Sequence, residues 1–200
     1  MKILFISAAN KNFDGRTRSL LEVLNSFAEV IDITATQEAD FAENSSYYVN
    51  YKSYKEFIRK TVELGKKHRD VDFIFADNRK ATVPALKLNK LLKPKAVIYD
   101  ARELYLQRET HGFASKVGCI FESRMISKAA LTICANEERK QVMEREYNKI
   151  GMILVFENFR KLSYSKDFRE EVMNHKFNYL NGDDSFKIVS TAGCEIERGT

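Results

Sequence analysis

Charged side chains follow a short apolar run near the middle of the chain. Ala96–Tyr99 is apolar, and Asp100, Arg102 and Glu103 come directly after it. An apolar run of this length between breaking residues predicts a buried strand. Open parallel sheets bind ligands in the crevice beyond the carboxyl ends of their strands, so these charged groups would lie at the mouth of a cleft. The alternative is a surface ion pair between Arg102 and Glu103, which would contribute little stability.

A second set of polar residues ends another apolar run. Phe73–Ala76 is followed by Asp77, Asn78 and Arg79. Parallel strands bring their carboxyl ends to the same edge of a sheet, so this set is expected at the height of the first one. Together the two stretches predict a polar mouth with two sides.

The loop after the first predicted strand carries one glycine. Lys2–Ser7 is the strand, and Gly15 follows with Arg16 and Arg18 beside it. The loop has neither the Gly-x-Gly-x-x-Gly spacing of dinucleotide sites nor a Gly-Lys-Ser/Thr phosphate cradle, so it supports neither a nicotinamide enzyme nor a P-loop nucleotidase. A single glycine can still bring backbone amides close to an anion or a sugar. A tight turn without a ligand is the alternative.

Other reactive side chains do not form recognisable sets. No nucleophilic serine or cysteine signature is present, and the cysteines are odd in number, far apart and without a Cys-x-x-Cys pair. We therefore expect thiols of a reducing cytosol, no zinc site, no other metal and no cofactor. The scattered residues are Cys119, Cys134, Cys194, His68, His111 and His175.

Strands and helices alternate along the chain, which is typical of a doubly wound α/β sheet of the Rossmann-like kind, mainly parallel. We expect an irregular excursion over Thr34–Ser53. Residues 1–160 would form one Rossmann-like domain, 161–185 a helix and linker, and 186–200 the first strand of a truncated second lobe. The expected strands are Lys2–Ser7, Val30–Ile33, Phe73–Ala76, Lys95–Tyr99, Leu131–Ala135 and Met152–Phe156, and the expected helices are 17–27, Lys55–Arg69, Thr82–Leu92, Ser115–Lys128 and Glu137–Tyr147.

The net charge of +5 and the pI of about 9.0 suggest an anionic partner. Acidic and basic residues are interleaved, so there is no long basic stripe for a nucleic-acid duplex, and we expect no nucleic-acid partner. No apolar run approaches the roughly 20 residues of a membrane span, and no secretory signal is visible. A cytoplasmic protein is therefore expected. The lysines and arginines of the Lys55–Arg69 helix are its solvated side or, alternatively, a peripheral contact with an anionic inner membrane face.

Several stretches in order resemble one known family. They are Met1–Ser7 with Gly15, Asp77 after a strand, Tyr99–Tyr105, Ala130–Glu137 and the pair Glu157 and Asn158. In order and spacing they are similar to the amino-terminal lobe of the GT-B glycosyltransferases, and within these to the large retaining "group 1" family. The resemblance covers nearly the whole chain, and Lys187–Thr200 resembles the start of the second lobe.

The resemblance implies that this lobe binds a sugar acceptor, either a polysaccharide or a lipid-linked sugar. A nucleotide sugar would be the second substrate, bound mainly by the other lobe, with no metal. The family often has a histidine where this sequence has Arg102, so the resemblance assigns no catalytic residue. The substrate-binding residues that it implies are Gly15, Arg16, Asp77, Asn78, Arg102, Glu103, Glu137 and Asn158.

One lobe alone cannot supply all that nucleotide-dependent transfer requires. Positive charge must stabilise the departing diphosphate, and two lobes must close to exclude water. The residues that do this in the family would lie beyond Thr200, so we expect this chain to be an incomplete, inactive part of a larger enzyme. The competing hypothesis is a non-catalytic Rossmann-like module that binds a sugar or a protein partner.

Overall fold

The computed structural model describes residues 1–106 and 110–157. They belong to one compact unit, Met1–Asn158. The helix, linker and strand expected over 161–200 lie outside the described residues. No helix in the described ranges is long and apolar enough to cross a membrane.

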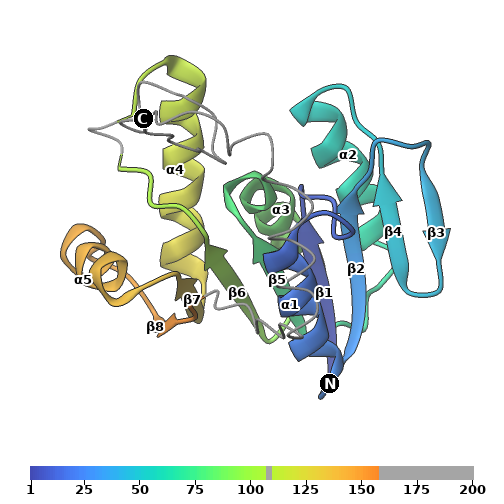
Figure 1. Cartoon of the computed structure of the whole chain (residues 1–200), viewed down its shortest axis with the longest axis horizontal. Coiled ribbons are helices and arrows are strands. Elements are labelled where there is room, and N and C mark those ends of the chain that lie inside the picture. The colour runs from blue at the N-terminus through green and yellow to red at the C-terminus, as the bar shows by residue number, and fades with distance from the viewer. Residues whose placement is uncertain (107–109, 158–200) are drawn as a thin grey trace, which may run out of the picture. The chain divides into compact units, whose positions relative to one another are not determined.

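An eight-stranded sheet forms the centre of this unit, in the order β3-β4-β2-β1-β5-β6-β7-β8 (Figure 1). Every neighbouring pair is parallel except β3 and β4. The expected mainly parallel, Rossmann-like sheet is therefore confirmed. The strands are β1 (Lys2–Ser7), β2 (Glu29–Ala35), β3 (Phe41–Glu43), β4 (Ser46–Val49), β5 (Phe73–Asp77), β6 (Ala96–Ala101), β7 (Leu131–Cys134) and β8 (Met152–Val155).

Helices cover both faces of the sheet, as the two separate apolar cores show. On one face, Leu20, Leu21 and Leu24 of α1 pack with Ile3 and Phe5 of β1. The core on the other face contains residues of α2, α3, α4 and α5. The helices are α1 (Gly15–Asn25), α2 (Tyr54–Gly65), α3 (Thr82–Leu92), α4 (Phe113–Lys128) and α5 (Glu137–Glu146), with a short 3₁₀ turn, η1, at Arg79–Ala81.

The direction of winding reverses at β1. The chain runs from β1 through α1 to β2 on one side, and later returns to β5 on the other side of β1. Right-handed crossovers then require helices on opposite faces. The loops after β1, β5 and β6 meet at this switch point, which is where open α/β sheets place their ligand sites.

The expectation of an irregular segment over Thr34–Ser53 is wrong. The segment contains the hairpin of β3 and β4, and β4 pairs in parallel with β2. Tyrosines favour strands, but these strands have only three and four residues, too few for alternation to be visible. Phe41 stacks on Tyr48 across the hairpin with ring centroids 4.1 Å apart.

Candidate functional site

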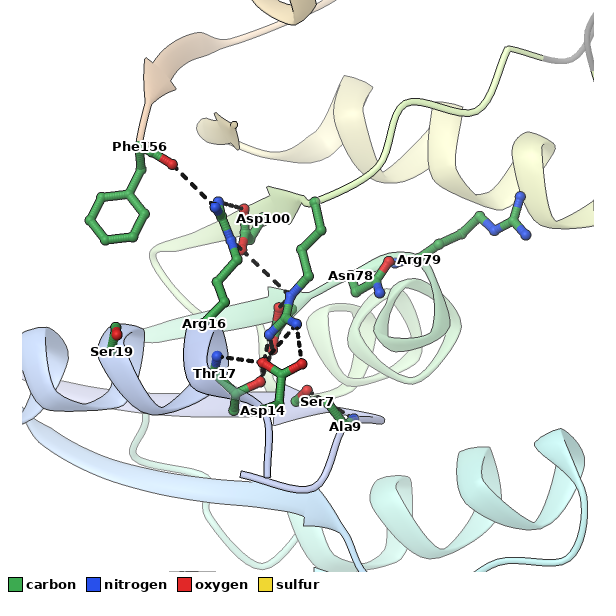
Figure 2. Close-up of polar contacts among 12 residues, drawn as sticks. Ser7, Ala9, Asp14, Arg16, Thr17, Ser19, Asn78, Arg79, Asp100 and Phe156 are labelled. Atoms are coloured by element: carbon green, nitrogen blue, oxygen red, sulfur yellow. Dashed lines mark hydrogen bonds and ion pairs between the residues drawn. The ribbon is translucent and has the colours of Figure 1, made fainter. Parts of the chain in front are cut away.

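Arg102 is the centre of an ion-pair network at the carboxyl edge of the sheet. Its Nε donates to Oδ1 of Asp77 and its second terminal nitrogen to Oδ2, both at 2.6 Å. The other terminal nitrogen donates to both carboxylate oxygens of Asp14 at 2.8 Å. Figure 2 shows Asp14 and Thr17 at this junction. One side chain thus connects the ends of β5 and β6 to the start of α1.

Arg16 makes a second, parallel ion pair beside the first. Its Nε and one terminal nitrogen donate to the two oxygens of Asp100 at 2.8 and 2.7 Å. The remaining nitrogen donates to the carbonyl oxygen of Phe156 at 3.1 Å, as Figure 2 shows. Bidentate pairs of this kind fix the orientation of both partners.

The strand register places the carboxylates side by side. Ser7, Asp77 and Asp100 are aligned across β1, β5 and β6. Asp77 and Asp100 are fully buried. Burying charges away from water is costly unless they are paired and hydrogen-bonded. The carboxylates therefore need the two arginines, and the arginines need the carboxylates.

The start of α1 is set by Asp14. Its side chain accepts a hydrogen bond from the amide of Thr17 at 2.7 Å and so caps the helix. Thr17 in turn donates its hydroxyl to Oδ2 of Asp77 at 3.0 Å. Within the described ranges no partner is seen for the first-turn amides of Gly15 and Arg16, which a helix cannot satisfy by itself. Amides at a helix start can bind a sugar hydroxyl or a phosphate.

The network shifts the pKa values of its members. Burial raises the pKa of Asp77 and the neighbouring Asp100 adds to the shift, although the guanidinium of Arg102 opposes it. Burial acts against the charge of Arg102, but Asp77 and Asp14 together raise its pKa above the ordinary value. Arg102 and the amide of Thr17 lower the pKa of Asp14 despite its partial burial. Arg102 therefore keeps its charge at every physiological pH.

Asn78 has an unusual backbone conformation at this edge. Its φ of 69° and ψ of 166° lie in a region that glycine prefers. Two hydrogen bonds hold it there: its amide N–H donates to the carbonyl of Asp100 at 3.0 Å, and its side-chain oxygen accepts from the amide of Arg79 at 2.6 Å. Strain at such a position is typical of functional sites.

The outer rim is held by Arg139 of α5. It donates to the carbonyl oxygen of Arg102, and a second nitrogen lies 3.3 Å from Glu103. Glu137 is exposed and pairs with Lys140 at 3.1 Å, apart from the network.

The structure brings together most of the residues that the sequence suggested. Arg16, Asp77 and Arg102 share the network, Gly15 and Asn78 adjoin it, and Glu103 is attached through Arg139. Glu137 is not part of it, and Asn158 lies outside the described residues. Among the described residues, no group of three His, Cys, Asp or Glu side chains is arranged to hold a metal ion.

The sequence reasoning missed Asp14, Thr17 and Arg139. A signal existed for the first two, because an aspartate directly before a helix predicts a cap, and the structure begins α1 at Gly15 rather than at the expected residue 17. No sequence signal marks Arg139, whose contact with Arg102 joins residues 37 positions apart.

Comparisons with known proteins find the fold but no close relative. No family model and no curated protein matches the sequence. Among solved structures, sucrose-phosphate synthase from Thermosynechococcus elongatus matches with a TM-score of 0.61 and 10% identity, over 78% of this chain and 48% of that one. HepE of Anabaena, in complex with UDP and glucose, matches with a TM-score of 0.55 and 14% identity, over 80% of this chain and 45% of that one.

The chain therefore has the fold of one lobe of the GT-B glycosyltransferases, which confirms the fold that the resemblance implied. It spans about half the length of these structures. A second form of the synthase is covered over 91% of its length, with a TM-score of 0.59 and 14% identity.

Proposed function

We propose that this chain is the acceptor-binding lobe of a glycosyltransferase that moves a sugar from a nucleotide-sugar donor to a polysaccharide or lipid-linked sugar. The observation that carries the proposal is the pairing of both arginines at the switch point. Arg16 and Arg102 are neutralised by Asp100, Asp77 and Asp14. Guanidiniums bound in this way are poorly placed to neutralise a diphosphate, and the rim suits a neutral, hydroxyl-rich ligand better.

The rim offers both donors and acceptors to such a ligand. The amides of Gly15 and Arg16 can donate to sugar oxygens, and the exposed carboxylate of Glu103 can accept from sugar hydroxyls. The network orients these groups because Arg102 and Arg139 fix the loop that carries Glu103. Transfer additionally requires positive charge at the leaving diphosphate, so we expect the isolated chain to bind acceptor without transferring sugar.

A cytoplasmic location, with peripheral contact at an anionic inner membrane face, belongs to the same proposal. Lys55, Lys66 and Lys67 of the α2 region are exposed, and none has a carboxylate partner in the described part of the chain. Such free cations are attracted to anionic lipid surfaces.

Binding of acceptor saccharides to the ¹⁵N-labelled chain tests the proposal. We expect oligosaccharides to shift the amide resonances of Gly15, Arg16 and Glu103, and Glu103→Ala to weaken binding several-fold. Glu144→Ala removes an exposed carboxylate from the last turn of α5, at the other end of the helix from Arg139, and is the matched control. Saccharide-induced shifts confined to other parts of the sheet would contradict the assignment. Robust sugar transfer by the isolated chain would contradict the lobe's inactivity, and saccharide binding by a complete protein with no transferase activity would favour the non-catalytic module.

A further inference from the structure

A cavity of about 450 Å³ lies where the amino-terminal ends of α2, α3 and α4 meet. Its volume is within the range of small-molecule sites. Its walls are mostly apolar, and none of the described residues that line it is acidic. The apolar side chains of the lining are those of Tyr54, Val83, Phe113, Ala114, Val117 and Phe121.

The mouth of the cavity exposes apolar surface. The side chain of Phe113, the first residue of α4, is 85% exposed although it borders the cavity. Gly118 lies directly beside Arg79, because a Cβ atom there would be at ordinary contact distance, 3.5–3.7 Å, from the side chain of Arg79. Apolar walls that stay open to solvent are typical of a surface that a ligand covers.

Two cations stand at one end of this apolar space. Arg79 and Lys80 both line the cavity, and neither forms an ion pair with a carboxylate in the part of the chain that the structure describes. The guanidinium of Arg79 packs over the ring of Tyr105 at 3.8 Å, and the hydroxyl of Tyr54 donates to the carbonyl oxygen of Lys80 at 3.0 Å. The fold thus places two cations, neither with a carboxylate partner among the described residues, beside an apolar cavity.

The cavity is connected to the candidate site through the chain. Arg79 follows Asn78, whose N–H donates to the carbonyl oxygen of Asp100. Figure 2 shows the side chain of Arg79 leaving Asn78 in the direction away from Asp14 and Arg16. Arg79 is thus two residues along the chain from Asp77, a member of the ion-pair network.

We propose that this cavity binds the apolar chain of an amphiphile whose phosphate group contacts Arg79 and Lys80. The inference rests on the proposed function and narrows it, because such a ligand is the carrier part of a lipid-linked sugar acceptor, and the sugar would extend from the phosphate to the rim. An acidic peptide matches the charge less well, because its backbone needs hydrogen-bond partners and Thr82 and Ser115 are the main polar side chains, apart from the cations, that the described lining offers.

Titration of the 200-residue chain with farnesyl phosphate, below its aggregation concentration, tests the proposal by calorimetry. We expect farnesyl phosphate to bind at least tenfold more tightly than farnesol or inorganic phosphate. Ala114→Trp, which fills the cavity from an exposed position, should weaken binding tenfold or more, and Lys80→Ala about fivefold. Lys128→Ala removes the same charge at the far end of α4 and should leave binding unchanged.

Vesicles of phosphatidylglycerol identify the source of the amphiphile. If the Ala114→Trp variant no longer binds farnesyl phosphate but still binds vesicles, the cavity binds a single acceptor molecule. If the variant binds neither farnesyl phosphate nor vesicles, the cavity binds bulk anionic lipid. Failure of farnesyl phosphate to bind, tighter binding of an acidic, phenylalanine-containing peptide, or an Ala114→Trp variant that is folded by circular dichroism and binds as well as the wild type would each overturn the proposal. Farnesyl phosphate carries no sugar, so its failure to bind is distinguishable from a failure of saccharides to shift the rim resonances.

Discussion

Arg102 binds the carboxylate of Asp77 through two hydrogen bonds of 2.6 Å, although 25 positions separate them in the chain. The contact follows from the sheet. Asp77 ends β5, Arg102 follows β6, and the two strands are parallel neighbours with Asp77 aligned to Asp100. A fully buried carboxylate thereby receives its counter-charge from the next strand's loop, so the geometry of the rim and the stability of the fold depend on the same pair.

Replacing Arg102 should therefore destabilise the protein strongly. Arg102→Met leaves Asp77 buried without its guanidinium, and breaking a buried pair in this way costs about 3–5 kcal/mol of unfolding free energy. Urea denaturation followed by circular dichroism measures the loss. The double variant Arg102→Met/Asp77→Asn should recover part of it, because the fully buried position 77 then carries no charge, while Asp14, which also loses its partner, is partly exposed.

An exposed pair provides the control for this measurement. Arg59 and Glu63 lie on the solvent side of α2 with a separation of 3.2 Å and are both well exposed. Arg59→Met should change the unfolding free energy by less than about 0.5 kcal/mol. An Arg102→Met variant no less stable than Arg59→Met would show that Asp77 does not depend on its partner.

Glu122 predicts a specific pH dependence of stability. Burial raises the pKa of this carboxyl from 4.5 to about 7, against the opposing effects of Tyr99 and Arg79. The folded state then holds a proton that the unfolded state has released between these pH values, so unfolding free energy falls as pH rises from about 5 to 7 and levels off above. Glu122→Gln should remove this fall. The unfolding free energy of the variant, relative to that of the wild type, should therefore rise by roughly 2–3 kcal/mol between pH 5 and pH 8.

Urea denaturation of both proteins at several pH values measures the effect. In the Glu122→Gln variant the amide oxygen can still accept the hydroxyl hydrogen bond that Tyr99 now donates to Glu122 at 2.6 Å, so packing is preserved. Glu138→Gln, at an exposed position of α5, is the matched control and should follow the wild type at every pH. Parallel stability curves for Glu122→Gln and the wild type would contradict a buried, protonated Glu122.

The arrangement of the elements was predictable to the extent that it depends on local pattern. Apolar runs alternating with helical spacing indicated a parallel sheet, and parallel strands have their carboxyl ends together, so Asp77 and Arg102 were expected at one edge. Which atoms pair was not predictable, because Asp14 and Arg139 reach Arg102 from segments far apart in sequence. The hairpin of β3 and β4 is too short for a periodic signal. The cavity depends on how three helices pack, which no local pattern specifies.

At position 78, glycine should give a more stable protein than alanine, which is the reverse of the usual order. Alanine is ordinarily the more stable of the two, because glycine loses more conformational freedom on folding. Here the φ of 69° and ψ of 166° strain any residue with a Cβ atom. Both Asn78→Gly and Asn78→Ala lose the side-chain hydrogen bond to the amide of Arg79, so their difference isolates the backbone term. We expect the unfolding free energy of Asn78→Gly to be about 1 kcal/mol higher than that of Asn78→Ala, as measured by thermal or urea unfolding. A more stable Asn78→Ala variant would show that the backbone relaxes without cost.

Two glycines should respond to alanine in opposite directions. A Cβ atom on Gly151 would lie 2.6 Å from the carbonyl oxygen of Ala129 and 2.7 Å from that of Ala130. Both are backbone atoms, and Ala130 also accepts the hydrogen bond from Met152 that begins the β7–β8 pairing, so β8 has to move. Gly151→Ala should therefore cost about 1–3 kcal/mol, as overpacking does.

Gly118 has the opposite surroundings and serves as the matched comparison. It lies within α4, and its added Cβ would be at ordinary contact distance from Arg79, 3.5 Å or more. Gly118→Ala should stabilise the protein by about 0.5–1 kcal/mol, because alanine is the better helix former.

Thermal unfolding of the two single variants and of their combination measures both effects. The two changes should add in the combination, because the sites share no contacts. A destabilised Gly118→Ala variant would mean that Arg79 cannot tolerate even a methyl group, and an unchanged Gly151→Ala variant would mean that β8 moves freely relative to β7.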